Sequence, residues 1–88
     1  MAYVYILESL KNGRYYIGCT SNLDQRIKTH QSGAVKYTKN ILPVKLVFKQ
    51  EYANIDIALK IEKKLKSLKR KDYISKIIKD GHIKVLGD

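Results

Sequence analysis

The sequence has very little of what stabilises or targets several common classes of protein. Its 88 residues include one cysteine, Cys19, and one proline, Pro43, so no internal disulfide can form and no proline-rich linker is present. One cysteine and two histidines, His30 and His82, cannot supply the four ligands of an ordinary structural zinc site. No segment approaches the roughly 18 consecutive apolar residues that span a bilayer, and the first apolar run is too short for a secretory signal. We therefore expect a cytoplasmic protein in a reducing compartment, with no membrane association.

Acidic residues are scarce as well. Eight Asp and Glu stand against eighteen Lys and Arg, which gives a formal net charge of +10. Self-repulsion at this charge opposes folding unless a polyanion binds, so we expect nucleic acid as the partner. The charge itself does not distinguish the two nucleic acids, and we expect DNA rather than RNA. A basic protein that is merely kept soluble by its charge is the alternative. The acids form no D-x-D or D-x-E pair, so a metal site would have at most one protein carboxylate per ion.

A β-hairpin is predicted near the start of the chain. Residues 3–9 and 14–19 are rich in Tyr, Ile and Val, and they flank an Asn-Gly dipeptide that favours a tight turn because both residues tolerate positive φ. A two-residue turn would place Ser9 opposite Tyr16, and since side chains alternate along a strand, Tyr5 and Tyr16 would share one face. A longer loop that shifts the pairing by two residues keeps both tyrosines on that face and brings them closer.

Beyond the hairpin the sequence predicts a helix, a third strand and two further helices. The first helix would begin at a cap of Ser21 or Asn22 and end at Gly33, because short polar side chains cap helix N-termini and glycine readily follows the last turn. The order is therefore β-β-α-β-α-α, an α+β fold, in one domain over residues 1–80 with a C-terminal tail at 81–88. The predicted helices cover residues 23–31, 54–67 and 71–79, and a polar loop covers 36–39. The strand covers 44–52, and the alternation of Val44, Leu46 and Phe48 with polar side chains predicts that these three share a half-buried face.

Glu62 lies in the longest predicted helix, at the edge of its apolar face. With 100° per residue, it falls about 40° from Ala58. A carboxylate there is partly desolvated and needs a partner, which is either a metal ion or a cation of the protein. Lys66, one turn later, offers such a cation, and an i, i+4 pair contributes a few tenths of a kcal/mol. The apolar face is expected to consist of Ile57, Ala58, Ile61, Leu65 and Leu68.

One candidate site can be assembled from Tyr5, Tyr16, Arg26, His30 and Glu62. Each of these residues also has an ordinary structural explanation, because tyrosine favours strands, histidine suits a last helical turn and glutamate pairs with lysine along a helix. Sequence motifs of acyl hydrolases, P-loop NTPases and Rossmann enzymes are absent, so these classes have no support.

The same residues resemble the GIY-YIG nuclease family, specifically its small single-domain bacterial branch, over residues 3–78. The resemblance rests on Val-Tyr-Ile at 4–6, Tyr-Ile-Gly at 16–18, Arg26, His30, Lys-Tyr-Thr at 36–38 and Glu62 within IEKKLK. It implies a three-stranded antiparallel sheet flanked by helices, with a nuclease site on the sheet.

The resemblance also implies a role for each site residue. Tyr16 is similar to the general base that activates water, Tyr5 to a second site tyrosine and Arg26 to the residue that steadies the phosphate. Glu62 resembles the ligand of a single Mg²⁺ or Mn²⁺, and His30 takes a supporting hydrogen-bonding position. A tyrosine hydroxyl with a solution pKa of about 10 is a poor base at pH 7, so nearby cations must lower that pKa. We expect a metal-dependent endonuclease that leaves a 5′-phosphate and a 3′-hydroxyl.

The chain departs from the family pattern in three ways. The first half of the family motif, here Val-Tyr-Ile at 4–6, lacks its glycine. Larger members place an Asn after the metal-binding helix, whereas no Asn follows Asn54 here, and their separate DNA-targeting domain is absent. We expect a monomer whose targeting a protein partner supplies. A non-catalytic nucleic-acid-binding module on the same scaffold is the second hypothesis, and a protein-interaction adaptor is the third. The side chains expected at the nucleic acid are Lys36, Tyr37, Thr38, Lys39, Lys63, Lys66, Lys69 and Arg70.

Overall fold

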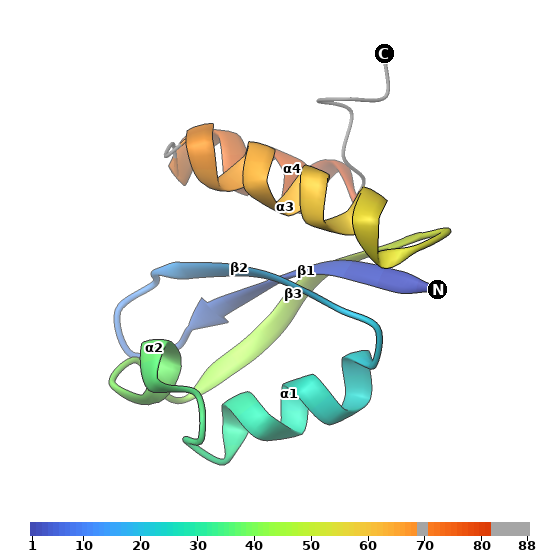
Figure 1. The fold of residues 1–88 in the computed structure, drawn as a ribbon. Coiled ribbons are helices and arrows are strands. Elements are labelled where there is room, and N and C mark those ends of the chain that lie inside the picture. The colour runs from blue at the N-terminus through green and yellow to red at the C-terminus, as the bar shows by residue number, and fades with distance from the viewer. Residues whose placement is uncertain (69–70, 82–88) are drawn as a thin grey trace.

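The computed structural model, which describes residues 1–68 and 71–81, contains a three-stranded antiparallel sheet between two layers of helices. In Figure 1, α3 and α4 cover one face of the sheet, and α1 and α2 lie against the other. This confirms the α+β fold and the predicted order, with one added helical turn, α2, in the segment expected to be a loop. Among the described residues, no helix is both long and apolar enough to cross a membrane. The elements are β1 (Ala2–Ser9), β2 (Tyr15–Thr20), α1 (Leu23–Gln31), α2 (Lys36–Lys39), β3 (Val44–Tyr52), α3 (Ile55–Leu68) and α4 (Lys71–Asp80).

The β1–β2 hairpin adopts the longer of the two predicted loops. Tyr16 lies opposite Leu7, and Tyr5 lies opposite Gly18, so the pairing is shifted by two residues from that of a two-residue turn. The loop is longer because the Ser9 carbonyl accepts a hydrogen bond from the Gly13 N–H at 2.9 Å, and Gly13 has a φ of 76°. Tyr5 and Tyr16 therefore share one face of the sheet, as expected.

Helix caps lie where the sequence predicts them. Asn22, rather than the alternative Ser21, caps α1, and its side-chain oxygen accepts a hydrogen bond from the Gln25 N–H at 3.2 Å. Gly33 follows α1 with a φ of 83°, in the left-handed region that favours glycine. Asn54 caps α3 in the same way, since its side-chain oxygen accepts a hydrogen bond from the Ile57 N–H at 3.0 Å.

The central strand β1 contributes to two separate cores. Ala2, Val4 and Ile6 pack with α3 and α4, whereas Tyr5 and Leu7 belong to a smaller cluster beside α1. Each fully buried apolar side chain contributes about 1.5–3 kcal/mol. From the helices, the larger cluster takes Ala58, Ile61, Leu65, Ile74 and Ile77.

Ile57 is a correction to the predicted apolar face of α3. It is 40% exposed, whereas Ala58, Ile61 and Leu65 are buried. Ile57 lies at the edge of the apolar arc and in the first turn of the helix, so the sheet does not cover it.

Strand β3 corrects a second expectation. Strict alternation would place Val44, Leu46 and Phe48 on one face, but the register shifts by one residue of β3 between the pairs Ile6–Phe48 and Leu7–Leu46. Such a bulge inverts the alternation of side chains. Phe48 consequently packs in the α3–α4 core, and Val44 packs in the cluster beside α1.

Candidate active site

Three buried polar side chains form a hydrogen-bonded chain between β1, α1 and α2. The Tyr5 hydroxyl lies 2.9 Å from His30 Nε2, and His30 Nδ1 lies 2.9 Å from the Thr38 hydroxyl. All three residues are fully buried. Burial, followed by the positive charge of Arg26, lowers the pKa of His30, so the imidazole is neutral at pH 7. A buried polar group without a hydrogen bond costs about 1–3 kcal/mol. These hydrogen bonds therefore allow the three side chains to be buried beneath α1.

Arg26 connects this chain to the surface. Its Nε donates a hydrogen bond of 3.4 Å to the Tyr5 hydroxyl oxygen, and this bond is the main cause that raises the pKa of Arg26. The pKa of Tyr5 is raised chiefly by burial, although the bond from Arg26 opposes this. Tyr5 is therefore a neutral phenol at pH 7, suited to hydrogen bonding and unsuited to act as a base.

Tyr16 lies beside this chain on the edge strand β2 and is only partly buried. Its ring centroid is 4.9 Å from that of His30 and 6.3 Å from that of Tyr5. A side-chain hydrogen bond from Arg26 to Tyr16 also contributes to the raised pKa of Arg26. Of the two tyrosines, Tyr16 is thus the one that is partly exposed to solvent.

Gly18 is required by the position of the Tyr5 ring. The two residues are paired across β1 and β2, and a Cβ placed on Gly18 would overlap the Tyr5 phenol. Glycine at this position lets the phenol lie across β2 and reach His30 and Arg26. The glycine of the second half-motif therefore has a steric role in this chain.

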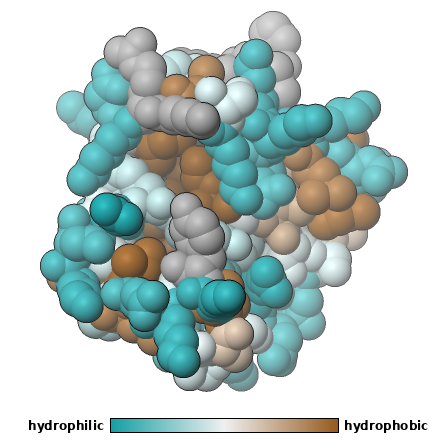
Figure 2. Space-filling view, turned by 60° about the vertical axis from the view of Figure 1, so that its left-hand side comes forward, coloured by the Kyte–Doolittle hydropathy of each residue, from teal (hydrophilic) through white to brown (hydrophobic). Residues whose placement is uncertain are grey.

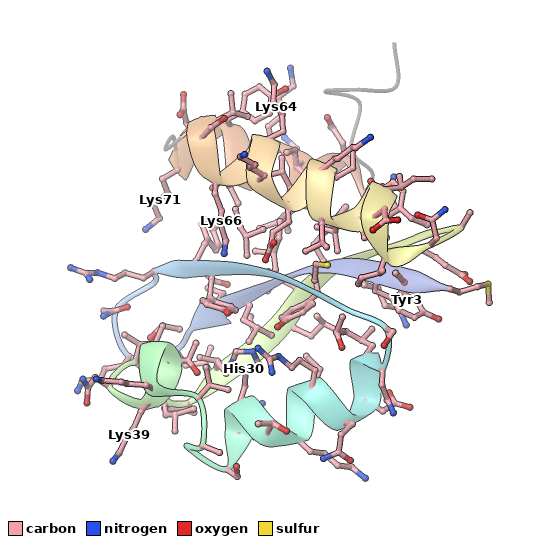
Figure 3. The ribbon with its side chains drawn as sticks, viewed as in Figure 1. Tyr3, His30, Lys39, Lys64, Lys66 and Lys71 are labelled. Carbon is pink, nitrogen blue, oxygen red and sulfur yellow. The ribbon has the colours of Figure 1, made fainter. Side chains whose placement is uncertain are left out.

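Glu62 and Lys66 reach the site from the opposite face of the sheet. Helix α3 packs on the other side, but β2 is an edge strand, so side chains of α3 can extend past it. Lys66 Nζ lies 3.3 Å from Glu62 Oε2 and 5.8 Å from the Tyr16 ring centroid. In Figure 3, Lys66 extends from α3 toward β2, whereas Lys64 points away from the sheet. Burial is the main cause that raises the pKa of Tyr5, and the charge of Glu62 adds the smallest contribution.

Glu62 could supply a single carboxylate to one hard divalent cation. Within residues 1–68 and 71–81, no three His, Cys, Asp or Glu side chains are arranged to hold a metal. A single carboxylate suits Mg²⁺ or Mn²⁺, because Mg²⁺ keeps several waters and takes further oxygens from a substrate phosphate. The Glu62 side chain is 18% exposed, and its partner Lys66 is 51% exposed, so the lysine can leave the carboxylate.

Most of the chain matches a known protein family. A family model described as the GIY-YIG catalytic domain matches residues 1–76. The chain belongs to the GIY-YIG family. A UPF0213 protein of Streptococcus pneumoniae serotype 4 is 44% identical over 70 residues, which cover 78% of this chain and 70% of that protein. UPF0213 protein CPE1444 of Clostridium perfringens is 41% identical over 87 residues, covering 98% and 83% of the two chains.

A solved structure extends the likeness of this GIY-YIG domain to the fold. The solution NMR structure of the UPF0213 protein BH0048 from Bacillus halodurans is 37% identical in sequence. It superposes with a TM-score of 0.58 and covers 92% of this chain and 87% of its own. The family supports a nuclease-like function and a nucleic-acid substrate.

Of the residues expected at the nucleic acid, the described lysines lie at the surface of the GIY-YIG domain, but Thr38 does not. Lys36 and Lys39 are exposed on α2, and Lys63 is exposed on α3. Thr38 differs from the expectation, because it is fully buried against His30 and so lies behind the surface assigned to nucleic acid. On the face shown in Figure 2, hydrophilic side chains predominate around a band of apolar atoms. The side chain of Tyr37 and the whole of Lys69, Arg70 and His82 lie outside the described residues.

Lys71 is a basic residue beside β2 that was not among the side chains expected at the nucleic acid. It begins α4, and its Nζ lies 5.6 Å from the centroid of the Tyr15 ring on the other face of β2. Lys71 and Lys66 therefore both stand near the edge strand. The basic composition of residues 60–71 was the available signal, but only the packing of α4 decides which lysines approach β2.

Proposed function

We propose that this GIY-YIG domain is a metal-dependent endonuclease that hydrolyses phosphodiester bonds of nucleic acid, with DNA favoured over RNA. The observation that carries the proposal is that side chains of α1 and α3, from opposite faces of the sheet, approach the edge strand β2. Arg26 and Tyr16 approach from the α1 face, and Glu62 approaches from the α3 face. We further propose a cytoplasmic monomer whose targeting is supplied by a protein partner.

Tyr16 is assigned the role of general base. It is the tyrosine at the solvent-facing rim, while Tyr5 is held as a neutral phenol by burial. In this mechanism the Tyr16 oxygen takes a proton from the attacking water, a contribution of about 10²–10⁴-fold in rate. Two cations lie beside it, the guanidinium of Arg26 and the ammonium of Lys66, whose Nζ is 5.8 Å from the Tyr16 ring centroid.

Arg26 is assigned to the phosphate. Its guanidinium can donate to the non-bridging oxygens as negative charge develops there, and removal of one such donor typically costs about 3 kcal/mol of transition-state stabilisation. The hydrogen bond from Nε to Tyr5 orients the guanidinium, so its remaining N–H groups can donate in defined directions.

Glu62 would hold a single Mg²⁺ or Mn²⁺, which when bound neutralises the charge on the leaving oxygen. Lys66 must release the carboxylate for this, and its ammonium then stays near the substrate backbone. The products expected are a 5′-phosphate and a 3′-hydroxyl.

Cleavage assays test the proposal directly. Wild type, Glu62→Gln and Tyr16→Phe are incubated with branched, duplex and single-stranded DNA and with RNA, in Mg²⁺, Mn²⁺ or EDTA. We expect metal-dependent cleavage by wild type and a loss of about 100-fold or more in both variants, with binding retained in gel shifts. Glu51→Gln, an exposed acid on β3, is the matched control and keeps wild-type activity. Cleavage that survives Glu62→Gln would refute the assigned metal ligand.

The ion pair between Glu62 and Lys66 favours a second candidate, a non-catalytic binding module. In that case the carboxylate keeps its lysine, and the basic residues hold phosphates. Binding would fall steeply with salt and would be unaffected by EDTA or Tyr16→Phe. Salt-sensitive binding without cleavage of any substrate by wild type would establish this candidate in place of the nuclease.

A further inference from the structure

The hydrogen-bonded chain through His30 has an obligatory donor at one end and a carbonyl acceptor at the other. Arg26 Nε can only donate, and it donates to the Tyr5 oxygen at 3.4 Å. The Val35 carbonyl can only accept, and it accepts from the Thr38 hydroxyl over a long contact of 3.5 Å. Between these ends lie Tyr5, His30 and Thr38, each of which can donate or accept.

One direction of donation satisfies every contact in the chain. Arg26 Nε–H donates to Tyr5, the Tyr5 hydroxyl donates to His30 Nε2, and His30 Nδ1–H donates to the Thr38 oxygen. The Thr38 hydroxyl then donates its own proton to Val35. A neutral imidazole has one N–H and one bare nitrogen, so this arrangement uses both ring nitrogens in their proper roles.

The reverse direction is poorer. Thr38 would give its one hydroxyl proton to His30 Nδ1, and the contact with the Val35 carbonyl would lose its hydrogen. His30 Nε2–H would donate to Tyr5, whose own buried proton would then need an acceptor other than His30. The first direction needs no such rearrangement.

We propose that Thr38 is a positioning residue that selects the Nδ1–H tautomer of His30 and thereby orients Tyr5 and Arg26. With Nε2 bare, the Tyr5 hydroxyl points its proton at His30 and turns its oxygen lone pair to Arg26 Nε. The other four N–H donors of the guanidinium remain for neighbouring groups and for a phosphate. The tautomer assignment is independent of activity, whereas the effect on cleavage rests on the proposed function.

Nitrogen NMR of the histidine side chains tests the tautomer in the unmodified protein. Long-range ¹H–¹⁵N correlations distinguish protonated from bare ring nitrogens, and His30→Gln assigns the signals against His82. At neutral pH we expect a protonated Nδ1 and a bare Nε2 in His30. A protonated Nε2 in wild type would overturn the proposal without any variant of Thr38.

Two substitutions then test the part played by Thr38. Thr38→Val keeps the shape but removes the acceptor, so the proton is expected to move to Nε2; Thr38→Ser keeps the hydroxyl and the Nδ1–H tautomer. Thr29→Val is the matched control, because its hydroxyl bonds the Gln25 carbonyl on the same helix as His30 and lies outside the chain. Amide spectra and thermal melting show whether each variant is folded. An unchanged tautomer in folded Thr38→Val would contradict the proposal.

Cleavage provides the second measurement. Loss of a supporting partner behind a site residue typically lowers activity about 10–100-fold, so Thr38→Val should show such a loss and Thr38→Ser should restore the rate. A shifted tautomer with an unchanged rate would refute the positioning role. If no protein cleaves nucleic acid although the tautomer responds as expected, the proposed nuclease function fails and the tautomer assignment stands.

Discussion

The two faces of the sheet differ in what they bury. On the side of α3 and α4, β1 contributes Val4 and Ile6 to a core of mainly aliphatic side chains. On the side of α1 and α2, the same strand contributes Tyr5, which lies with His30 and Thr38 in a fully buried polar chain. Hydrophobic burial is the dominant favourable contribution to folding, whereas buried hydrogen bonds contribute little net free energy. The α3 face therefore supplies most of the hydrophobic stabilisation, whereas the α1 face holds a set of buried polar side chains in fixed positions.

Leu65→Ala should have the largest effect on stability. Leu65 is 1% exposed in the α3–α4 core, and its truncation leaves a cavity that costs about 2–5 kcal/mol. Chemical denaturation measures the free energy of unfolding, while NMR of His30 in the folded fraction should remain as in wild type. Altered His30 signals would show that a change in the α3–α4 core also disturbs the polar chain on the other face of the sheet.

Gly18→Ala should act on the other face. The added methyl group overlaps the Tyr5 ring, so the phenol must move, at a cost of about 1–3 kcal/mol. Its contacts with His30 and Arg26 should break, and His30 ring signals should shift accordingly. Cys19→Ala, on the next residue and facing the α3 side, is the control that should leave these signals unchanged. Retention of wild-type His30 signals in Gly18→Ala would contradict the steric role of this glycine.

The polar face should also make stability depend on pH. Because the folded-state pKa of His30 is lowered, the unfolded chain binds a proton more readily than the folded chain. The stabilisation is complete above the unfolded pKa of about 6.5 and is lost as the pH falls from there through the folded value. Unfolding free energies between about pH 8 and pH 5 measure this loss. His30→Gln should flatten the dependence and His82→Gln should leave it in place; an equal slope in wild type and His30→Gln would contradict the assignment.

Lys66→Met should have the smallest effect on stability and a specific effect on the site. Lys66 is 51% exposed, so its pair with Glu62 contributes no more than about 1 kcal/mol. Without the ammonium, Glu62 should bind Mn²⁺ more tightly, which paramagnetic broadening of neighbouring NMR signals detects without any substrate. The double variant with Glu62→Gln is the control that should lose this broadening. Equal broadening in wild type and Lys66→Met would show that the lysine does not compete for the carboxylate.

Local patterns predicted the elements well. Asn22, Gly33 and Asn54 lie at helix ends as expected, because caps depend on a few neighbouring residues and on backbone groups that every helix leaves unpaired. The shared face of Tyr5 and Tyr16 was also predictable, since the period of a strand is two under either loop length. Lys66, one of the two partners expected for Glu62, lies 3.3 Å from its carboxylate.

Other features depended on contacts distant in the chain. The bulge in β3 moves Phe48 and Val44 to opposite faces. The alternation of side chains in the sequence does not reveal the one extra residue of the bulge. Thr38 was expected at the nucleic acid because it belongs to the polar segment 36–39, yet it is buried against the imidazole of His30, eight residues earlier in the chain. No periodic pattern of neighbouring residues predicts this contact between Thr38 and His30.

The sequence by itself determined the order of strands and helices, the basic character of the chain and the residues that resemble a nuclease site. These follow from local backbone preferences, side-chain period and composition. Only the tertiary structure decided that β2 is an edge strand past which Lys66 and Glu62 can reach toward Tyr16. It also decided that Arg26, Tyr5, His30 and Thr38 form one chain. The physical reason is that hydrogen bonds and burial depend on which segments pack together, and packing is a property of the whole fold.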